Sequence, residues 1–291
     1  MTSPSTKPPA SVVSVLEQTL KDIGIPTRPV ILDLIDAEMR KEEPDSMRLE
    51  QLISADVSLS ASLIKMANSA YFGRHGRARG VHDALQVLGL KATSRAIAGL
   101  SLRKAFPTTP RLERFWNASA EIAVLSGWLA RVIEKPKVRP DEAYTYGLFR
   151  DCGIPVMLQR FPTYEQTLTR ANDELVLPYT AVELKDFPTD HTMVGCLLAQ
   201  NWWLPEEVCL AIRHHHDVRA IDQLESGVPA LTRHIVATGQ TAEYIQQQLT
   251  GLGHTMEWSK LGESCLRLLN LTEDEVAALC VDAVEVLKTV A

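Results

Sequence analysis

The sequence predicts an all-helical protein, and three observations favour this fold class. Apolar residues recur at helical spacing along most of the chain, beginning with the run 12–22. Strand-like alternation is scarce, and the Asn-Gly pairs typical of β-hairpin turns are absent. Glycine and proline residues interrupt the periodic runs where helices would end. We therefore expect a multi-helix bundle.

The first third of the chain predicts several short helices. The run 12–22 ends at Gly24, and Pro29 suits the first turn of the next helix, which we expect to reach about residue 41. Asp56 or Ser58 can cap a later helix through its side-chain oxygen. Gly89 should separate two further helices. The expected helices here are 12–22, 29–41, 48–55, the run after Asp56, 81–88 and 92–105.

Pro107 and Pro110 mark the best internal boundary, and long periodic runs resume after it. We expect an interruption near Gly153 inside the run 141–160. Thr272 and Glu275 form a capping-box pattern that starts the last helix. The expected helices are 112–133, 141–160, 163–172, 181–186, 192–202, 206–215 and the segment after Thr272.

Composition limits the function classes. The chain has 291 residues, 45% of them hydrophobic and 23% charged, values typical of a globular protein with a sizeable core. The net charge of −6 argues against a general nucleic-acid binder. The segment 71–105 is nonetheless basic and the segment 217–291 acidic, so the basic segment could meet phosphate or an acidic partner, or could be a solvated face that pairs with the acidic part.

The expected location is the cytoplasm. The five cysteines show no CxxC spacing, which fits reduced thiols better than a disulfide framework. Residues 1–10 lack an apolar core and suggest a flexible lead-in rather than a signal peptide. No stretch is long and apolar enough to predict a membrane span.

Two stretches of the sequence resemble a known family. The first runs from 53 to 73, ISADVSLSASLIKMANSAYFG, and is followed at 81–90 by VHDALQVLGL. The second runs from 147 to 158, GLFRDCGIPVML, and is followed at 190–217 by DHTMVGCLLAQNWWLPEEVCLAIRHHHD. In this order they resemble the HDOD domain, the HD-related output domain of bacterial signalling proteins, over about residues 23–217.

The resemblance implies a layout and a role. It implies an N-terminal helical part at 11–107, an HD-like helical part at 108–217 and kinship with the HD and HD-GYP phosphohydrolases. Residues 218–291 would then form a helical extension packed on the core. HDOD domains are thought to lack catalysis and to act as output modules that bind other proteins. The partner would be a sensor kinase, a response regulator or a cyclic-di-GMP enzyme.

The metal site of HD enzymes uses a His on one helix, a His-Asp pair on the next and a later Asp, which together hold ions that activate water. In this sequence Ala118 falls at the first position and Arg150 and Asp151 at the pair. The last position falls near Thr238 or Gly239. Arginine has donors only and cannot coordinate a metal. Because Asp151 alone remains, we expect an ion pair between helices, no enzyme activity and no cofactor.

The histidines offer a residual divalent-metal site. Histidines at corresponding places extend the site in metal-active relatives, so Asp151, His191, His214 and His215 are the candidates. His214, His215 and His216 cannot all face one point, because each helical step turns by about 100°. The alternative is that these histidines bond to backbone or carboxylate groups at a helix end.

Basic residues offer an anion site. Arg74, Arg77 and Arg79 lie in a glycine-rich loop, where guanidinium and amide groups can bind phosphate or carboxylate groups; the alternative is a solvated loop. Lys91 and Arg95 begin the second helix of a helix–glycine–helix pattern that resembles a DNA-binding motif. Apolar residues fill much of that helix, so we expect no nucleic-acid partner.

Three hypotheses follow. The first is a non-catalytic signalling module that binds protein partners. The second is a divergent metal-dependent phosphohydrolase acting on a cyclic nucleotide or phosphate ester. The third is a nucleic-acid-binding regulator.

Overall fold

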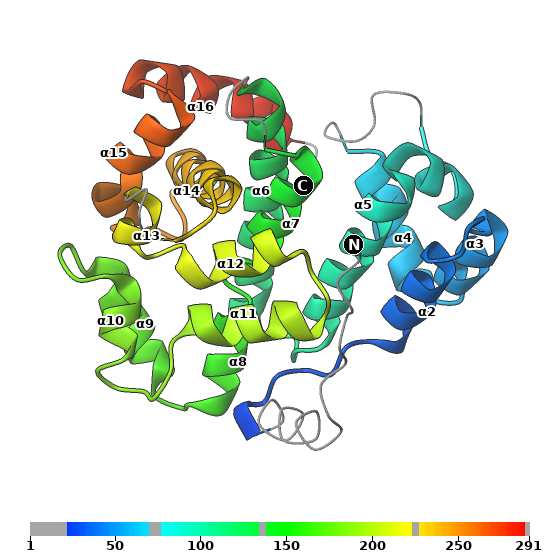
Figure 1. Ribbon diagram of the computed structural model, residues 1–291, viewed down its shortest axis with the longest axis horizontal. Helices are drawn as coiled ribbons and strands as arrows, with labels where there is room; N and C mark the ends of the chain where they lie inside the picture. The colour runs from blue at the N-terminus through cyan, green and yellow to red at the C-terminus, as the bar shows by residue number, and fades with distance from the viewer. Residues whose placement is uncertain (1–21, 70–76, 134–137, 223–226, 289–291) are drawn as a thin grey trace, which may run out of the picture.

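The computed structural model describes residues 22–69, 77–133, 138–222 and 227–288. Every regular element within these ranges is a helix, as the periodicity predicts. The expected helix at 12–22 lies almost wholly outside the described residues. Figure 1 shows the helices in two groups, with α2 to α5 to one side of the rest.

The smaller group, which we call the N-terminal part, contains four helices. Asp45 caps α3 by accepting bonds from the amides of Met47 and Arg48, and Asp56 caps α4 by accepting from the amide of Leu59. Gly89, at φ 73° and ψ 162°, is not helical, so α5 consists of two helical segments that meet at a kink, as expected. The helices are α2 (Val30–Met39), α3 (Ser46–Ser54), α4 (Val57–Ala67) and α5 (Val81–Lys104).

The remaining helices form the larger group. From here on we call this group the HD-like part, since it contains both the segment expected at 108–217 and the helices after it. They are α6 (Pro110–Val132), α7 (Pro140–Phe149), α8 (Gly153–Arg160), α9 (Tyr164–Asp173), α10 (Tyr179–Glu183), α11 (His191–Asn201), α12 (Glu206–His214), α13 (Val218–Asp222), α14 (Ala230–Thr250), α15 (Glu257–Leu269) and α16 (Glu273–Leu287). The break expected near Gly153 lies earlier, at 150–152, because Gly153 begins α8 and Pro155 fits its first turn. The capping box at Thr272 and Glu275 is present.

Helix α14 lies at the centre of the HD-like part. Figure 1 shows it nearly end-on, surrounded by helices from before and after it in the sequence, and it contacts α6, α7, α12, α15 and α16. Its close approach to α7 depends on Gly239, since a Cβ there would lie 2.2 Å from a ring carbon of Tyr146. The segment after residue 217 therefore supplies a central helix rather than only an outer layer.

Arg28 and two tryptophans join the two groups of helices. Arg28 Nε donates to the carbonyl of Trp202 (3.2 Å), and Trp202 Nε1 donates to the carbonyl of Pro26 (3.1 Å). The Arg28 guanidinium also lies 4.3 Å from the ring centre of Trp203. Trp203 has φ 59°, a left-handed conformation that is unusual for a tryptophan. We call these contacts the Arg28–Trp203 junction.

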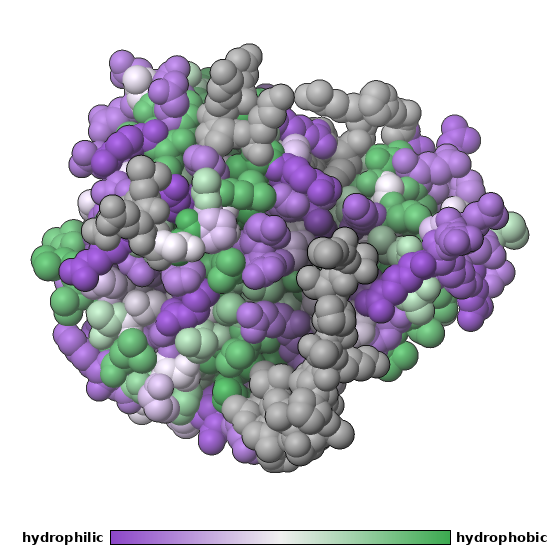
Figure 2. Space-filling model, in the orientation of Figure 1, coloured by the Kyte–Doolittle hydropathy of each residue, from purple (hydrophilic) through white to green (hydrophobic). Residues whose placement is uncertain are grey.

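The surface mixes residue types. Figure 2 shows hydrophilic and hydrophobic residues interspersed on the face it presents. Across the described residues, no helix combines the length and the apolar character needed to cross a bilayer.

Candidate functional site

Four side chains from the ends of α7, α11 and α12 converge on one point. Asp151 lies in the turn between α7 and α8, His191 is the first residue of α11, and His215 and His216 follow α12. One ligand-type atom from each lies within 4.8 Å of the others. We call these four residues the His–Asp cluster. All three imidazoles are buried, and the Asp151 side chain is partly exposed.

Acceptor groups around the cluster fix the orientation of its imidazoles. His191 Nδ1 lies 2.8 Å from a carboxylate oxygen of Glu183, and His216 Nδ1 lies 2.5 Å from Glu257 Oε2. His215 Nδ1 lies 2.8 Å from the carbonyl oxygen of Ile212. Carboxylates and carbonyls orient metal-binding histidines in the same way, by accepting a hydrogen bond from the ring N–H that faces away from the metal.

These contacts leave two unprotonated nitrogens facing one another. If Nδ1 of His191 and of His215 each donates outward, both Nε2 atoms carry a lone pair, and they lie 3.4 Å apart. Asp151 Oδ1 lies 3.2 Å from Nε2 of His215 and 3.7 Å from Nε2 of His191. Three electron-rich atoms in one buried space repel one another, so the cluster needs a proton or a metal ion at its centre.

The local environment favours His191 for the proton. Burial alone would lower the pKa of His191, but the neighbouring Glu183 carboxylate outweighs burial and raises it. Burial lowers the pKa of His215, and burial together with the neighbouring His215 holds the pKa of His216 well below its usual value. A protonated His191 can donate its Nε2 proton toward His215 or Asp151.

Arg150 places a permanent cation beside the cluster. Its guanidinium is buried and forms ion pairs with Asp151 (Nε to Oδ2, 3.2 Å) and with Glu243 of α14 (Nη1 to Oε2, 2.9 Å). Burial would raise the pKa of Asp151, but the neighbouring Arg150 and His215 outweigh it and hold that pKa well below its usual range. Arg150 therefore balances the charge of carboxylates from two different elements.

A cavity of about 440 Å³ opens beside Asp151 and Arg150. We call it the α6–α14 cavity. Ala118, at which the resemblance predicts a missing histidine ligand, lies on its wall. Gly239 packs against Tyr146 instead. The α14 carboxylate that lines the cavity is Glu243, one helical turn further along.

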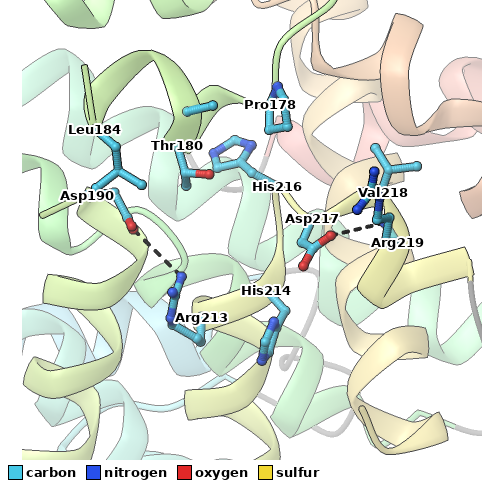
Figure 3. Close-up of a pocket in the computed structure, with 11 residues that line it drawn as sticks. Pro178, Thr180, Leu184, Asp190, Arg213, His214, His216, Asp217, Val218 and Arg219 are labelled. Atoms are coloured by element: carbon cyan, nitrogen blue, oxygen red, sulfur yellow. Dashed lines mark hydrogen bonds and ion pairs between the residues drawn. The ribbon is translucent and has the colours of Figure 1, made fainter. Parts of the chain in front are cut away.

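The expectation that His214 joins the cluster is wrong, and His216 takes its place. Figure 3 shows His214 and His216 projecting in opposite directions from the chain that leaves α12. His214 lines a surface pocket of about 560 Å³ with Arg213 and Arg219, and His216 reaches the same pocket from the cluster. Burial and the neighbouring Arg213 lower the pKa of His214. The chain leaves the helix after His214, so the two histidines that follow can turn inward.

The described anion candidates lie in different environments. Arg74 lies outside the described residues. Arg77, Arg79 and Lys91 are exposed. Arg95 forms an ion pair with Asp141 of α7, so this guanidinium joins the N-terminal part to the HD-like part.

Several residues of the site carried no signal in the sequence. Glu183, Glu243 and Glu257 come from three different helices, and only the fold brings them to the cluster. Tyr164 donates to Glu183, and Tyr179 stacks on His216 with ring centres 4.6 Å apart. A buried aromatic shell thus surrounds the polar centre.

Fold and site define a helical protein that holds a buried cluster of three histidines and one aspartate. The model of the HDOD domain matches residues 25–218, which is more than half of the sequence, so the chain belongs to the HDOD family. This match includes the His–Asp cluster but not α14.

The curated relative that matches is an uncharacterised protein of Treponema pallidum (strain Nichols), 27% identical over 188 residues. The match covers 64% of this chain and 36% of that protein, so this chain spans only about a third of its relative.

Three solved structures share the fold. An HDOD domain protein of unknown function from Geobacter sulfurreducens has a TM-score of 0.66 at 23% identity, covering 96% of this chain and 97% of that one. A Shewanella amazonensis SB2B protein, provisionally named a phosphohydrolase, has a TM-score of 0.68 at 20% identity, covering 96% and 98%. A Marinobacter aquaeolei VT8 protein, provisionally named a signal transduction protein, has a TM-score of 0.62 at 22% identity, covering 94% and 59%.

Proposed function

We propose that this chain is a bacterial signalling output module that acts by binding a protein partner and does not hydrolyse phosphate esters. The observation that carries the proposal is the placement of Arg150. Its buried guanidinium pairs with Asp151 and Glu243, the carboxylates that would otherwise be free to hold a metal ion. Guanidinium remains charged at all physiological pH values and offers no lone pair to a metal.

The other replaced positions support the same proposal. Ala118 offers no ligand, and Gly239 leaves no room for a carboxylate beside Tyr146. A two-ion centre, which clamps both the attacking and the leaving oxygen, would need ligands at these positions. The remaining cluster is a single group of three imidazoles and one carboxylate.

Family membership, the shared fold and the cysteines support the proposed role in signalling and the proposed cytoplasmic location. Membership of the HDOD family and the fold shared with a protein named for signal transduction favour a regulatory role. Four of the five cysteines are buried and all five are free thiols, which suits a reducing compartment. The partner classes that fit are a sensor kinase, a response regulator and a cyclic-di-GMP enzyme.

Two measurements test this proposal. The purified chain, supplied in turn with manganese, iron, zinc and nickel, should leave bis-p-nitrophenyl phosphate and cyclic dinucleotides intact. Hydrolysis that Asp151→Asn abolishes would overturn the non-catalytic assignment. Binding of the chain to purified candidates of the three partner classes should yield at least one stable complex, and the absence of any would contradict the partner-binding role.

A second candidate function, a mononuclear metal site, is favoured by the convergence of lone pairs at the cluster. Asp151, His191, His215 and His216 form a donor set that suits a divalent transition metal. A bound ion would supply Lewis-acid chemistry, while Glu183 and Glu257 would keep the imidazoles oriented.

Elemental analysis of protein purified without chelator decides between a proton and a metal ion at the cluster. Near-stoichiometric metal that falls in His215→Ala would establish the metal site. Metal-free protein that remains folded would assign the centre to a shared proton.

A further inference from the structure

The α6–α14 cavity has features that neither partner binding nor the His–Asp cluster explains. Its volume of about 440 Å³ lies within the range of small-molecule sites. Apolar side chains from α6, α8 and α9 line part of it, and α14 contributes amides and a carboxylate. We call these apolar side chains, Phe115, Ile122, Ile154 and Leu168, the apolar wall.

Two buried glutamines present acceptors to this cavity. Gln246 and Gln247 are 2% and 5% exposed. The amide nitrogen of Gln246 donates to Glu121 Oε2 (2.9 Å) and Thr250 Oγ1 (3.2 Å), and that of Gln247 donates to the carbonyl of Gly253 (2.9 Å). Carboxylate and carbonyl oxygens can only accept, so these partners fix which end of each amide is nitrogen. Within the described residues neither glutamine carbonyl oxygen accepts a hydrogen bond, so each is left to accept one from a ligand.

The charges on the cavity wall are mainly negative. Four carboxyl groups line it, against the guanidinium groups of Arg114 and Arg150. Arg150 is already paired with two of the carboxylates, and Glu257 pairs with Lys260 and His216. Glu121 has a hydrogen bond from Gln246 and, among the described residues, no cation within ion-pair distance. The carboxyl groups are Glu121, Asp151, Glu243 and Glu257.

An acceptor-rich, net-negative cavity with an apolar wall has a complementary ligand. The ligand should donate hydrogen bonds to Glu121 and to the glutamine carbonyls, carry positive charge, and place an alkyl or aromatic portion against Phe115 and Leu168. We propose that the α6–α14 cavity binds a small organic cation, a primary amine or guanidinium compound on an apolar stem.

This ligand class differs from that of a phosphohydrolase. A phosphate group would meet Glu121 and Glu243 without an unpaired cation deep in the cavity. A metal ion at the His–Asp cluster would add positive charge at the inner end and shift the preference toward anions. Protein-partner binding and amine binding are separate properties, so either can fail while the other holds.

Isothermal titration of the full chain, treated with chelator, tests the proposal with spermidine and agmatine as cationic probes and with adenosine monophosphate and inorganic phosphate as anionic ones. We expect saturable binding of at least one cation and none of the anions. Glu121→Gln and Gln246→Leu should each weaken that binding about tenfold or more, because the first removes the charge of a partly buried carboxylate and the second removes a buried amide acceptor. The matched control is Glu113→Gln, which removes the same charge from an exposed position on α6 outside the cavity.

Each outcome decides the matter. The proposal is overturned if neither cation binds saturably. It is also overturned if Glu113→Gln and Glu121→Gln weaken binding equally, since that would show diffuse attraction to an acidic surface. Anion binding as tight as cation binding also overturns it. Thermal unfolding of each variant distinguishes lost binding from lost folding, and Glu121→Gln retains a side chain that Gln246 can still bond.

Discussion

Arg150 brings a permanent positive charge into a part of the protein that excludes water. A buried guanidinium is tolerated only where carboxylates surround it, and here Asp151 and Glu243 do so from two different elements. The same arrangement holds Asp151 in its ionised form and turns its carboxylate toward His215. One side chain thus sets the charge balance of the cluster and of the cavity beside it.

Replacing Arg150 by methionine should destabilise the protein by about 3–5 kcal/mol, because two carboxylates would be left buried without a cation. Urea unfolding followed by circular dichroism measures this. Arg114→Met, at an exposed position, should change stability by less than about 0.5 kcal/mol. Equal effects from the two substitutions would mean that the ion pairs contribute no more than a surface charge.

Glycine residues allow helices of the HD-like part to pack closely against one another. Helices α7 and α14 meet where Gly239 faces Tyr146, and α6 and α7 meet at Gly147, where a Cβ would lie 2.8 Å from the Cα of Ala123. These contacts bring α14 near enough for Glu243 to reach Arg150. The absence of a carboxylate at position 239 thus has a packing reason, independent of any lost chemistry.

Gly239→Ala should destabilise the protein by about 1–3 kcal/mol, the usual cost of overpacking, since the added methyl would overlap the Tyr146 ring. Differential scanning calorimetry gives the shift in Tm. Gln248→Ala, exposed on the same helix, controls for helix propensity and should be close to neutral. A neutral Gly239→Ala would show that α14 can move away from α7 at no cost.

Helix α4 depends on the cap supplied by Asp56, which also pairs with Lys104 of α5 (2.7 Å). Asp56→Ala should cost about 1 kcal/mol, most of it from the lost cap, because exposed ion pairs contribute little. Asp56→Asn keeps the capping oxygen and should recover most of that loss. Urea midpoints compare the two, and equal losses would assign the stabilisation to the ion pair with Lys104 instead.

At the scale of the whole molecule, buried histidines couple stability to pH. The pKa values of four histidines lie below the ordinary value, and burial is the largest cause in each. His191 alone among the shifted histidines has a raised pKa. The four lowered histidines are His214, His215, His216 and His234.

Acid should therefore destabilise the protein. Below about pH 6.5 the unfolded chain takes up protons at the four lowered histidines before the folded chain does, so stability falls, by about 1.4 kcal/mol per pH unit for each proton. His191 acts in the opposite direction, since its contribution is fully present below pH 6.5 and is lost as pH rises through its folded pKa. Urea unfolding of chelator-treated protein at pH 7 and pH 5.5 should show the lower midpoint at pH 5.5. An unchanged midpoint would contradict the burial of these histidines.

The all-helical fold and most helix positions follow from the sequence because periodicity, caps and breakers are local. The sequence predicts the His–Asp cluster only in part. Helical geometry shows that His214, His215 and His216 cannot all face one point. Which of them turn inward depends on where α12 ends. Glu183, Glu243 and Glu257 reach the site through contacts between helices distant in sequence, which no local spacing encodes.

Trp203 gives the Arg28–Trp203 junction an intrinsic fluorescence probe. Trp203 is 58% exposed and lies between the guanidinium groups of Arg28 and Arg40, at 4.3 and 5.2 Å from the ring centre, whereas Trp116 and Trp202 are buried. A water-soluble quencher such as iodide will reach Trp203 more readily than these two or the partly buried Trp128 and Trp258, and the two guanidinium groups will attract the anion to it. Fluorescence quenching at this one ring therefore reports whether the N-terminal part and the HD-like part stay together or separate when a partner or ligand binds.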